Sequence, residues 1–421
     1  MKRILILNPG DRKIKNAVRD FMYGCWCKGR RIGGMQMPPL NHLYITTTLK
    51  ESGIDTEFVD AAIDYDSFER VIQNLDDFAG VIILSSTNSF KNDIKTLKKL
   101  KSHNQELLTI LFGSHPTFMP EYCIKEDVVD ILIFREPEFI IRDVVKKIVT
   151  NQDWRGVKGI GFRDNGKLRI NEAYPFINLD ELPIPDRSLL PKGIDYFNPV
   201  VKKMPYATMQ TSRGCPAQCN FCTVPTFFGR KARFRSVENV MKEIRHIKTL
   251  GYREIFFRDE TFTAYKKRNI KICESIIDEK IDLSWIANGR VDMIDLEQLT
   301  IMKQAGCHLV KFGVESGSQV ILNKLHKGIT IEQTQEAFRM CKEMGVDTHA
   351  HIMIGSPGET KETLEQTIKF IVKLNPSTGS FGICTPYPGT ELFDNVASCH
   401  PDIKDGSDAD MSKLHIQGFF N

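Results

Sequence analysis

Short runs of Val, Ile and Leu alternate with helical stretches along most of this 421-residue chain. Continuous apolar runs without polar alternation are typical of strands buried on both faces of a parallel sheet. The first half contains five of them, at Arg3–Leu7, Phe58–Val59, Val81–Leu84, Leu107–Phe112 and Ile131–Phe134. Helical stretches lie between them, at Asn41–Ser52, Asn92–Lys101 and Phe139–Val149. This order predicts a doubly wound α/β domain over residues 1–150, with right-handed crossovers.

Residues 151–205 have a different character. Val157–Leu168 is predicted to form a hairpin, because Asn165-Gly166 is a strong signal for a two-residue turn. A stretch with little helical periodicity follows, punctuated by Pro175, Pro183, Pro185, Pro191, Pro199 and Pro205. We interpret these residues as a linker that packs against its neighbours, since its apolar side chains need cover.

The βα alternation resumes after the linker with stronger periodicity. The strand candidates are Ala207–Gln210, Glu254–Phe257, Leu283–Ala287, Leu309–Val314, Thr348–Ile354 and Ser380–Ile383. Gly251, Gly306 and Gly345 each follow a helical stretch, where a left-handed cap is needed. Six βα strands predict a partial parallel barrel over residues 206–395, with its site at the carboxyl ends of the strands. Residues 396–421 are expected to form a tail.

Three cysteines follow the first barrel strand at the spacing CxxxCxxC: Cys215, Cys219 and Cys222. Thiolates of this number and softness suit an iron–sulfur cluster. Zinc would need a fourth Cys or His at comparable spacing, and Thr223, Val224 and Pro225 come next instead. Three ligands on a four-iron cluster leave one iron open, which indicates chemistry rather than a structural role.

Polar residues end the later barrel strands. They are Arg258-Asp259-Glu260-Thr261, Asn288-Gly289-Arg290, Glu315-Ser316-Gly317, and the segment from His349 and His351 to Gly355-Ser356-Pro357-Gly358-Glu359. Any one group could be a helix cap or a surface ion pair. Four such groups at one end of a barrel, beside the cysteine loop, favour a common site.

The first domain lacks both GxGxxG after its first strand and GxxxxGK[ST], so a dinucleotide or a nucleoside triphosphate is not expected. Gly113, Ser114 and His115 follow its fourth strand, and Glu136 follows its fifth. Small and polar residues there suit a large flat ligand, which His115 could contact, unless it only packs beside the next helix. Cys25 and Cys27 could form a metal or redox site. We favour the alternative that their loop lies over the ligand, with Trp26 as an apolar lid. Its basic Lys28, Arg30 and Arg31 either meet an anionic group or are solvated.

Composition limits the alternatives. The formal net charge is +4, too small to indicate a nucleic-acid or membrane partner. Eleven cysteines, an odd number in a long chain, favour reduced thiols over a disulfide framework. The apolar run near the N-terminus is too short for a signal peptide, and no transmembrane stretch is expected. These features predict a cytoplasmic protein.

The motif Cys215-x-x-x-Cys219-x-Phe221-Cys222 resembles that of the radical S-adenosylmethionine (SAM) enzymes. The first half is similar to the flavodoxin- or Rossmann-like cobalamin-binding domain of the cobalamin-dependent (class B) subfamily. This second resemblance is carried by residues in three places: Gly113-Ser114-His115-Pro116-Thr117, Glu136-x-Glu138 and Leu179-Asp180-Glu181-Leu182-Pro183. Together the two resemblances extend over roughly residues 2–392. The Asp-x-His-x-x-Gly motif is absent, and Arg135 and Pro137 replace glycines common in the family. Many relatives have a further C-terminal domain, so the chain is either a compact member or truncated.

The resemblance implies that Cys215, Cys219 and Cys222 hold a [4Fe–4S] cluster, whose open iron would be chelated by the amino and carboxylate groups of SAM. Phe221 would lie near the adenine, Glu260 would meet the SAM ammonium, and Arg290, Glu315 and Ser316 would line its carboxylate and ribose. The Gly113, Ser114, His115 and Glu136 positions would belong to the cobalamin site. Flavodoxin or ferredoxin would supply electrons.

The resemblance also implies a reaction. A 5′-deoxyadenosyl radical would remove hydrogen from an unactivated carbon of a small-molecule, lipid or peptide substrate. Methylcobalamin would then methylate that carbon. Radical cyclisation or rearrangement without methyl transfer is an alternative within the same architecture. A methylthiotransferase would need three further cysteines and an RNA-binding module, and a non-catalytic cobalamin sensor or carrier would not need the cysteine loop.

Overall fold

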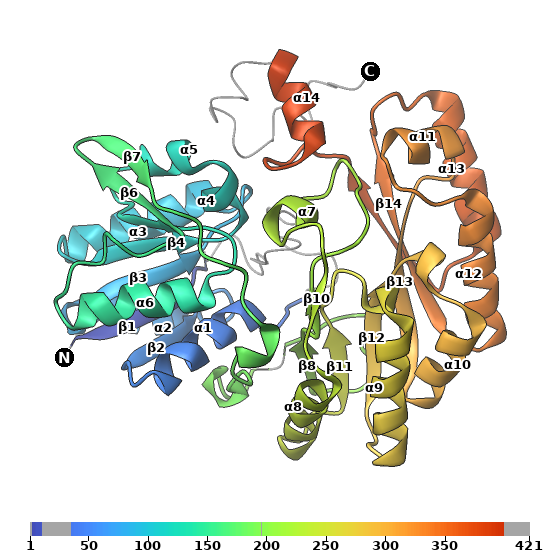
Figure 1. Cartoon of the computed structure of the whole chain (residues 1–421), viewed down its shortest axis with the longest axis horizontal. Helices are drawn as coiled ribbons and strands as arrows, with labels where there is room; N and C mark the ends of the chain where they lie inside the picture. The colour runs from blue at the N-terminus through green and yellow to red at the C-terminus, as the bar shows by residue number, and fades with distance from the viewer. Residues whose placement is uncertain (1, 11–34, 195, 400–421) are drawn as a thin grey trace. The chain divides into compact units, whose positions relative to one another are not determined.

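The computed structural model describes residues 2–10, 35–194 and 196–399. It divides into two compact units: the first runs to Pro199 and also takes the described residues from Ala397 onward, and the second is Val200–Val396 (Figure 1). Within those ranges, no helix has the length and apolar character that crossing a membrane requires.

The first unit is built on a seven-stranded sheet in the order β2-β1-β3-β4-β5-β6-β7. Its five parallel strands are β1 (Arg3–Asn8), β2 (Thr56–Asp60), β3 (Phe78–Leu84), β4 (Leu108–Phe112) and β5 (Ile131–Ile133). Its helices are α1 (Leu40–Glu51), α2 (Tyr65–Gln73), α3 (Phe90–His103), α4 (Ser114–Phe118), α5 (Pro120–Ile124) and α6 (Glu138–Val149). The doubly wound prediction is confirmed, and the order 2-1-3-4-5 places the topological switch point between β1 and β3.

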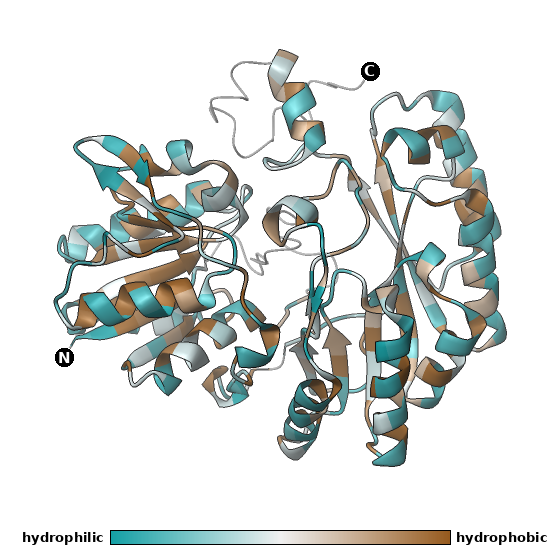
Figure 2. Cartoon of the chain, in the orientation of Figure 1, coloured by the Kyte–Doolittle hydropathy of each residue, from teal (hydrophilic) through white to brown (hydrophobic). Residues whose placement is uncertain are grey.

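Both faces of this sheet are apolar, and helices cover each of them. Leu5 and Leu7 of β1 pack with α2, α3 and α5 in one core cluster. Ile4 and Ile6 alternate with them, are fully buried and face the other side, where α1 and α6 contact each other. Figure 2 shows the strands mostly brown and the helices banded in teal and brown, as two-sided burial requires. The sequence analysis missed α2, whose apolar period covers only three buried side chains.

The predicted hairpin forms as β6 (Ile160–Asp164) and β7 (Lys167–Ile170). Asn165 and Gly166 both have positive φ, 49° and 77°, as a type I′ turn demands. The hairpin pairs antiparallel with β5 and therefore extends the first sheet, instead of lying in a separate linker. The segment after it is packed, because Ile177, Leu179 and Leu182 form a buried cluster with Leu40 and Tyr44 of α1.

The second unit contains six parallel strands in the order β15-β14-β13-β12-β11-β8. They are β8 (Tyr206–Met209), β11 (Glu254–Phe257), β12 (Ser284–Gly289), β13 (Cys307–Glu315), β14 (Asp347–Ile354) and β15 (Thr378–Ile383). A two-stranded ribbon joins β9 (Ser212–Arg213) to β10 (Arg233–Phe234). Six parallel strands confirm the predicted partial barrel, in which β8 and β15 are the edges.

Helices cover the outer face of this sheet (Figure 1). They are α8 (Val237–Thr249), α9 (Lys266–Asp278), α10 (Leu296–Gln304), α12 (Ile331–Glu343) and α13 (Lys361–Leu374). The shorter helices are α7 (Val224–Phe227), α11 (Gln319–Lys324) and α14 (Glu391–Cys399). Alternate strand residues such as Phe257, Trp285 and Phe312 form the core with these helices. The other strand residues face the inner side of the barrel.

Glycines with positive φ end three of the barrel helices, as expected: Gly251 (83°), Gly306 (97°) and Gly345 (61°). A Cβ atom at Gly306 would lie 2.3 Å from the carbonyl oxygen of Leu283, whereas one at Gly251 would meet nothing within 4 Å. The two positions share the same backbone requirement but differ in the space around it.

This contrast predicts different costs for the same substitution. Gly251→Ala should lower the free energy of unfolding by about 1–2 kcal/mol, because only the left-handed backbone is penalised. Gly306→Ala should lower it by about 3 kcal/mol or more, because a clash with backbone is added. The midpoint of urea unfolding measures both. Equal losses in the two variants would contradict the proposed close approach of Gly306 to Leu283.

Candidate functional site

The cysteine loop begins at the carboxyl end of β8 and is anchored by Asp259, which follows β11. The carboxylate of Asp259 is buried and accepts hydrogen bonds from the Thr211 amide (2.6 Å) and the Ser212 hydroxyl (2.8 Å). Gly214 then has φ 94°, and a Cβ there would lie 3.1 Å from the carbonyl oxygen of Lys231. The segment leading to Cys215 is therefore held between β11 and the β9–β10 ribbon.

Cys215, Cys219 and Cys222 are all free thiols and partly buried. Burial raises the pKa of the Cys222 thiol to about 12, with the neighbouring Cys219 and Cys215 adding to the shift. Burial also raises the pKa of Cys219, although Lys327 and Arg290 act in the opposite direction. Without a bound metal the Cys219 and Cys222 thiols are protonated, so metal binding would release their protons.

Two cations lie beside Cys219. The Arg290 Nη1 atom is 3.8 Å from the Cys219 sulfur, and its Nη2 donates to the carbonyl oxygen of Lys327 at 2.8 Å. Lys327 in turn donates to Glu315 Oε1 at 2.7 Å, and both side chains of this pair are buried. Each partner of a buried ion pair depends on the other, because removing either one leaves an uncompensated charge in a low-dielectric environment.

Glu315 itself is held in an uncommon backbone conformation, with φ 64° at the end of β13. Gly313 makes room for the ion pair, since a Cβ there would lie 2.4 Å from Glu315 Oε1 and 2.6 Å from Lys327 Nζ. Positive φ in a residue other than glycine is sparsely populated and costs energy, and such residues cluster at ligand sites.

Glu260 follows Asp259 at the end of β11. Its Oε2 accepts a hydrogen bond from the Gly214 amide at 3.0 Å. Its Oε1 is buried with no hydrogen-bond partner among the residues that the structure describes. Burial raises the pKa of Glu260 well above its usual value, and the Asp259 charge adds to the shift. An acceptor buried in this way is costly unless a donor from outside the chain reaches it.

Two other predicted residues differ in their surroundings. Phe221 is partly exposed, with Lys327 Nζ 5.9 Å from its ring centroid. The Ser316 hydroxyl is buried and lies 3.0 Å from the hydroxyl of Thr367, and it also accepts from the Ser318 amide. The hydroxyl of Ser316 therefore shapes the turn after β13.

In the first unit, Gly113 ends β4 with φ 118°, where a Cβ would lie 2.5 Å from the carbonyl oxygen of Ser85. Ser114 is buried, and its hydroxyl has no partner in the described part of the chain. His115 is fully buried between Phe90 and Tyr122, with ring centroids 4.6 and 5.7 Å away. Burial lowers its pKa to about 3, so the ring is neutral.

His115 thus packs beside the helix that follows, which is the second of the two interpretations given for it in the sequence analysis. Its Nδ1 lies 3.2 Å from the Thr87 hydroxyl, and its buried Nε2 has no partner among the described residues.

Glu136 follows β5 and is buried, and its Oε2 accepts from the Ile177 amide at 3.3 Å. Arg135, which replaces a family glycine, adopts φ 60° and so retains a conformation typical of glycine. Pro137 precedes the first turn of α6. The predicted Cys25–Trp26–Cys27 loop lies outside the described residues.

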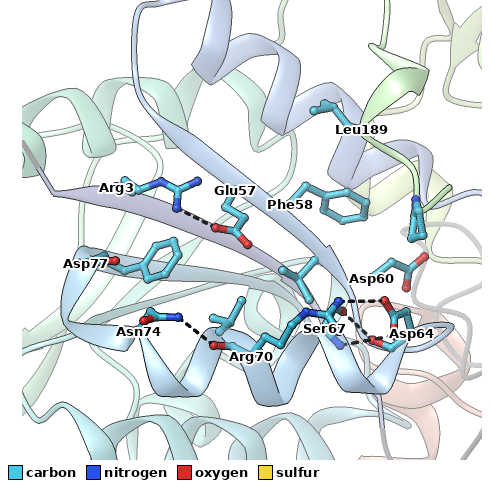
Figure 3. Close-up of a pocket in the computed structure, with 14 residues that line it drawn as sticks. Arg3, Glu57, Phe58, Asp60, Asp64, Ser67, Arg70, Asn74, Asp77 and Leu189 are labelled. Carbon is cyan, nitrogen blue, oxygen red and sulfur yellow. Dashed lines mark hydrogen bonds and ion pairs between the residues drawn. The ribbon is translucent and has the colours of Figure 1, made fainter.

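A pocket of about 420 Å³ lies elsewhere in the first unit, on the edge strand β2 (Figure 3). Ion pairs cross its surface, between Arg3 and Glu57 at 2.8 Å and between Arg70 and Asp64 at 3.4 Å. None of the predicted site residues lines it. Internally paired charges give it no evident ligand chemistry.

Sequence reasoning missed Lys327 and left Asp259 without a role. Lys327 follows α11 instead of a strand, so the search of strand ends did not reach it. Asp259 stands beside Glu260 at a strand end, and its position there was the available signal.

Comparison with known proteins now identifies the chain. A family model described as the radical SAM superfamily matches residues 209–371, and one described as the B12 binding domain matches residues 33–145. An uncharacterized methyltransferase of Pyrococcus horikoshii is 34% identical over 399 residues, which cover 94% of this chain and 83% of that protein. The chain belongs to the cobalamin-dependent radical SAM family.

Another relative carries a different name. The anaerobic magnesium-protoporphyrin IX monomethyl ester cyclase of Rubrivivax gelatinosus is 30% identical over 380 residues, covering 87% of this chain and 68% of that protein. The structure of TsrM from Kitasatospora setae, a radical SAM methyltransferase with cobalamin and a [4Fe–4S] cluster bound, superposes with a TM-score of 0.77 at 17% identity. It covers 95% of this chain and 78% of TsrM, and it confirms the predicted fold class.

Proposed function

We propose that this chain is a radical SAM C-methyltransferase in which Cys215, Cys219 and Cys222 hold a [4Fe–4S] cluster. The observation that carries the proposal is the convergence of three free thiols, paired buried charges and an unpartnered carboxylate oxygen at the strand ends of one barrel. Family membership adds the two cofactor-binding domains.

The cysteines fit a cluster better than a single ion. Three thiolates at the spacing CxxxCxxC are soft donors that suit iron, and no fourth Cys or His follows at comparable spacing. A zinc site would need four donors about 2.0–2.3 Å from one point. In a four-iron cluster each thiolate binds its own iron, so the sulfur atoms lie farther apart. The amino and carboxylate groups of SAM would complete the site at the iron that has no cysteine ligand.

When bound, these cofactors supply reductive cleavage of SAM, a hydrogen-abstracting 5′-deoxyadenosyl radical and a transferable methyl group. Glu260 Oε1, the unpartnered acceptor, would bind the SAM ammonium. Arg290, whose Nη1 already lies 3.8 Å from the Cys219 sulfur, would meet the SAM carboxylate. Glu315 and Ser316 would line the ribose and Phe221 the adenine, in agreement with the family resemblance.

In the first domain, Gly113, Ser114, His115 and Glu136 are proposed to contribute to the cobalamin site. The unpartnered Ser114 hydroxyl and His115 Nε2 are polar atoms that a ligand could satisfy. The close approach at Gly113 leaves no room for a side chain between β3 and β4. His115 is neutral and packed among aromatic rings, so we assign it a supporting contact rather than a ligand to cobalt.

Radical cyclisation without methyl transfer is the second candidate, because the Rubrivivax relative is named a cyclase. Appearance of a labelled methyl group from SAM in the product distinguishes the two. An electron donor such as flavodoxin or ferredoxin is required by the chemistry, and a reducing cytoplasmic setting would keep the thiols and the cluster intact.

The cluster assignment can be tested by removing one ligand. Cys219→Ala should abolish the brown colour, the iron content and the formation of 5′-deoxyadenosine after anaerobic reconstitution. Cys399→Ser is the matched control, because Cys399 is an exposed thiol distant in sequence from the motif and should retain all three. A full-strength cluster in Cys219→Ala would contradict the assignment.

The role of Glu260 can be tested separately from the cluster. Glu260→Gln keeps the acceptor for the Gly214 amide but removes the charge that would face an ammonium. The dissociation constant for SAM should rise about tenfold or more, as expected for loss of a charge-assisted hydrogen bond. Iron content should stay unchanged, and Glu332→Gln on the exposed surface of α12 should behave as wild type. Unaltered SAM affinity in Glu260→Gln would rule out this contact.

Cobalamin binding is measurable without turnover. The full chain incubated with hydroxocobalamin should carry it through gel filtration, with the absorbance of one corrinoid per chain. Emergence of all the corrinoid in the small-molecule volume would remove the proposed role of the first domain while leaving the cluster assignment intact.

A further inference from the structure

The cysteine loop reaches the surface of the second unit. Pro216 and Gln218, which lie between the first two cysteines, are exposed, and the three cysteines themselves are only partly buried. The rate of electron transfer between proteins falls steeply with distance. A protein that contacts this exposed loop would therefore be well placed to deliver an electron to a cluster held by the cysteines.

Two exposed cations border the start of this loop. Arg230 and Lys231 lie between α7 and β10, and both side chains are exposed. A Cβ at Gly214, the residue before Cys215, would lie 3.1 Å from the carbonyl oxygen of Lys231, so the two backbone segments are in close contact. Neither of the two cationic side chains forms an ion pair or a hydrogen bond with any residue that the structure describes.

A third exposed cation, Lys324, borders the middle of the loop. Asn220, which directly follows Cys219, donates from its side chain to the carbonyl oxygen of Lys324 at 2.7 Å. The Asn220 amide donates to the carbonyl oxygen of Leu325 at 3.2 Å, so this part of the loop is fixed against the end of α11. The Lys324 ammonium lies against Gly358, where a Cβ would overlap it, and has no ion-pair partner in the described part of the chain.

Acidic side chains are scarce around this loop. No Asp or Glu occurs among residues 196–237, which include the loop and the two cations after α7. Glu359 follows the glycine that contacts the third cation, but its carboxylate accepts from the Gly355 amide at 2.5 Å. Glu391 is an exposed carboxylate near the loop, 3.7 Å from His326 Nδ1. The exposed cations beside the loop therefore outnumber the exposed carboxylates.

We propose that Arg230, Lys231 and Lys324, here called the cationic rim, dock an acidic electron-transfer protein. This inference rests on the proposed radical SAM function, which needs one electron for each SAM cleaved, and it names the surface that receives the donor. The reduced donor is oxidised by one electron. That electron passes by way of the cluster to SAM, whose bond between sulfur and the 5′ carbon breaks to give methionine and the 5′-deoxyadenosyl radical.

The exposure of the cationic rim favours a protein partner over a small anionic substrate. A small-molecule site buries most of its ligand, whereas these three side chains are exposed and lie at two separate places along the loop. Exposed charges at the edge of an interface mainly steer association and fix the orientation of the partner, so their effect depends on salt. An acidic carrier would be oriented with its redox group toward the exposed loop.

The binding test uses the reconstituted full chain with two probes, an acidic flavodoxin and an RNA oligonucleotide. Isothermal titration at about 50 and about 500 mM NaCl gives the dissociation constant of each probe, because the higher salt concentration screens exposed charges. We expect flavodoxin to bind at low salt and to bind at least about tenfold more weakly at high salt. We expect the RNA to bind more weakly than flavodoxin at both salt concentrations.

A triple variant links the binding to the cationic rim. Arg230→Gln/Lys231→Gln/Lys324→Gln removes three positive charges from exposed side chains that form no ion pair among the described residues. The dissociation constant for flavodoxin at low salt should rise about tenfold or more, and its dependence on salt should weaken. Iron content and cluster absorbance equal to those of the wild type show that the variant folds.

The matched control removes three exposed lysines from the outer helix α13. Lys361→Gln/Lys369→Gln/Lys373→Gln lowers the net charge by the same amount, because these side chains also form no ion pair in the described ranges. It should bind flavodoxin as the wild type does. A loss of affinity equal to that of the rim variant would show that only net charge matters, and would overturn the proposal.

The source of electrons separates docking from chemistry. With reduced flavodoxin, the rim variant should form 5′-deoxyadenosine about tenfold more slowly than wild type at limiting flavodoxin. With reduced methyl viologen, a small cation that needs no docking surface, the two should be equal. Unaltered flavodoxin affinity in the rim variant would overturn the docking surface, while cleavage of SAM with methyl viologen would still support the proposed function.

Two further outcomes are decisive. Tighter binding of the RNA than of flavodoxin, lost in the rim variant, would assign the surface to nucleic acid and overturn the proposal. A wild-type chain that holds iron but does not cleave SAM with reduced methyl viologen would overturn the proposed function, and the inference with it.

Discussion

Parallel alignment of the strands is the constraint on which this protein depends. Within each sheet the carboxyl ends of neighbouring parallel strands lie at the same end of the sheet. Residues that follow these strands therefore lie close together, although they are far apart in the sequence. In the second unit this end gathers Gly214, Glu260, Arg290 and Glu315 from four different strands. The candidate site residues therefore lie at the carboxyl end of the strands, and residues at the amino end can be selected for stability alone.

The two buried cations beside the cysteine loop, Lys327 and Arg290, are each paired with a carboxylate of the chain itself. Burial alone would lower the pKa of Lys327, but the charge of Glu315 and the hydrogen bond to it raise the pKa, so the ammonium stays charged. Arg290 is likewise fixed, because Asp292 accepts from its Nε at 2.9 Å. These two cations are thus held close to Cys219 while its thiol is still protonated. If the proposed cluster binds and the thiols lose their protons, Lys327 and Arg290 would already supply positive charge to stabilise the thiolates.

Much of the fold followed from local sequence patterns, and the remainder required long-range packing. The Val-Ile-Leu runs, the Asn165-Gly166 turn and the glycine after α10 each act within a few residues, so the sequence alone could predict them. The pairing of the β6–β7 hairpin with β5 could not be predicted, because a local turn signal does not say which distant strand the hairpin will join. Lys327 could not be found either, since its contact with Glu315 depends on how α11 folds back over β13. The burial of His115 between Phe90 and Tyr122 is a tertiary property in the same sense.

Two glutamates, one in β11 and one just after it, differ in how the chain satisfies a buried carboxylate, and this difference supports the role proposed for the second. Glu254, at the amino end of the strand, is fully buried, and its oxygens accept from His308, Ser284 and the amides of Lys202 and Lys203. Burial alone would raise the pKa of Glu254, but these bonds lower it, and the carboxylate is charged and satisfied.

Glu260 lies six residues later, at the opposite end of the same strand, and has one amide donor and one unpartnered oxygen. Burial of a carboxylate is tolerated only where donors repay its lost hydration. At Glu254 the chain supplies donors to both carboxylate oxygens, whereas at Glu260 it supplies a donor to only one of the two oxygens. We propose that the missing donor comes from a bound molecule, and a cationic one would restore the charge that burial suppresses. The same criterion, applied to buried polar atoms at the strand ends of any parallel barrel, separates groups that hold the fold from groups that await a ligand.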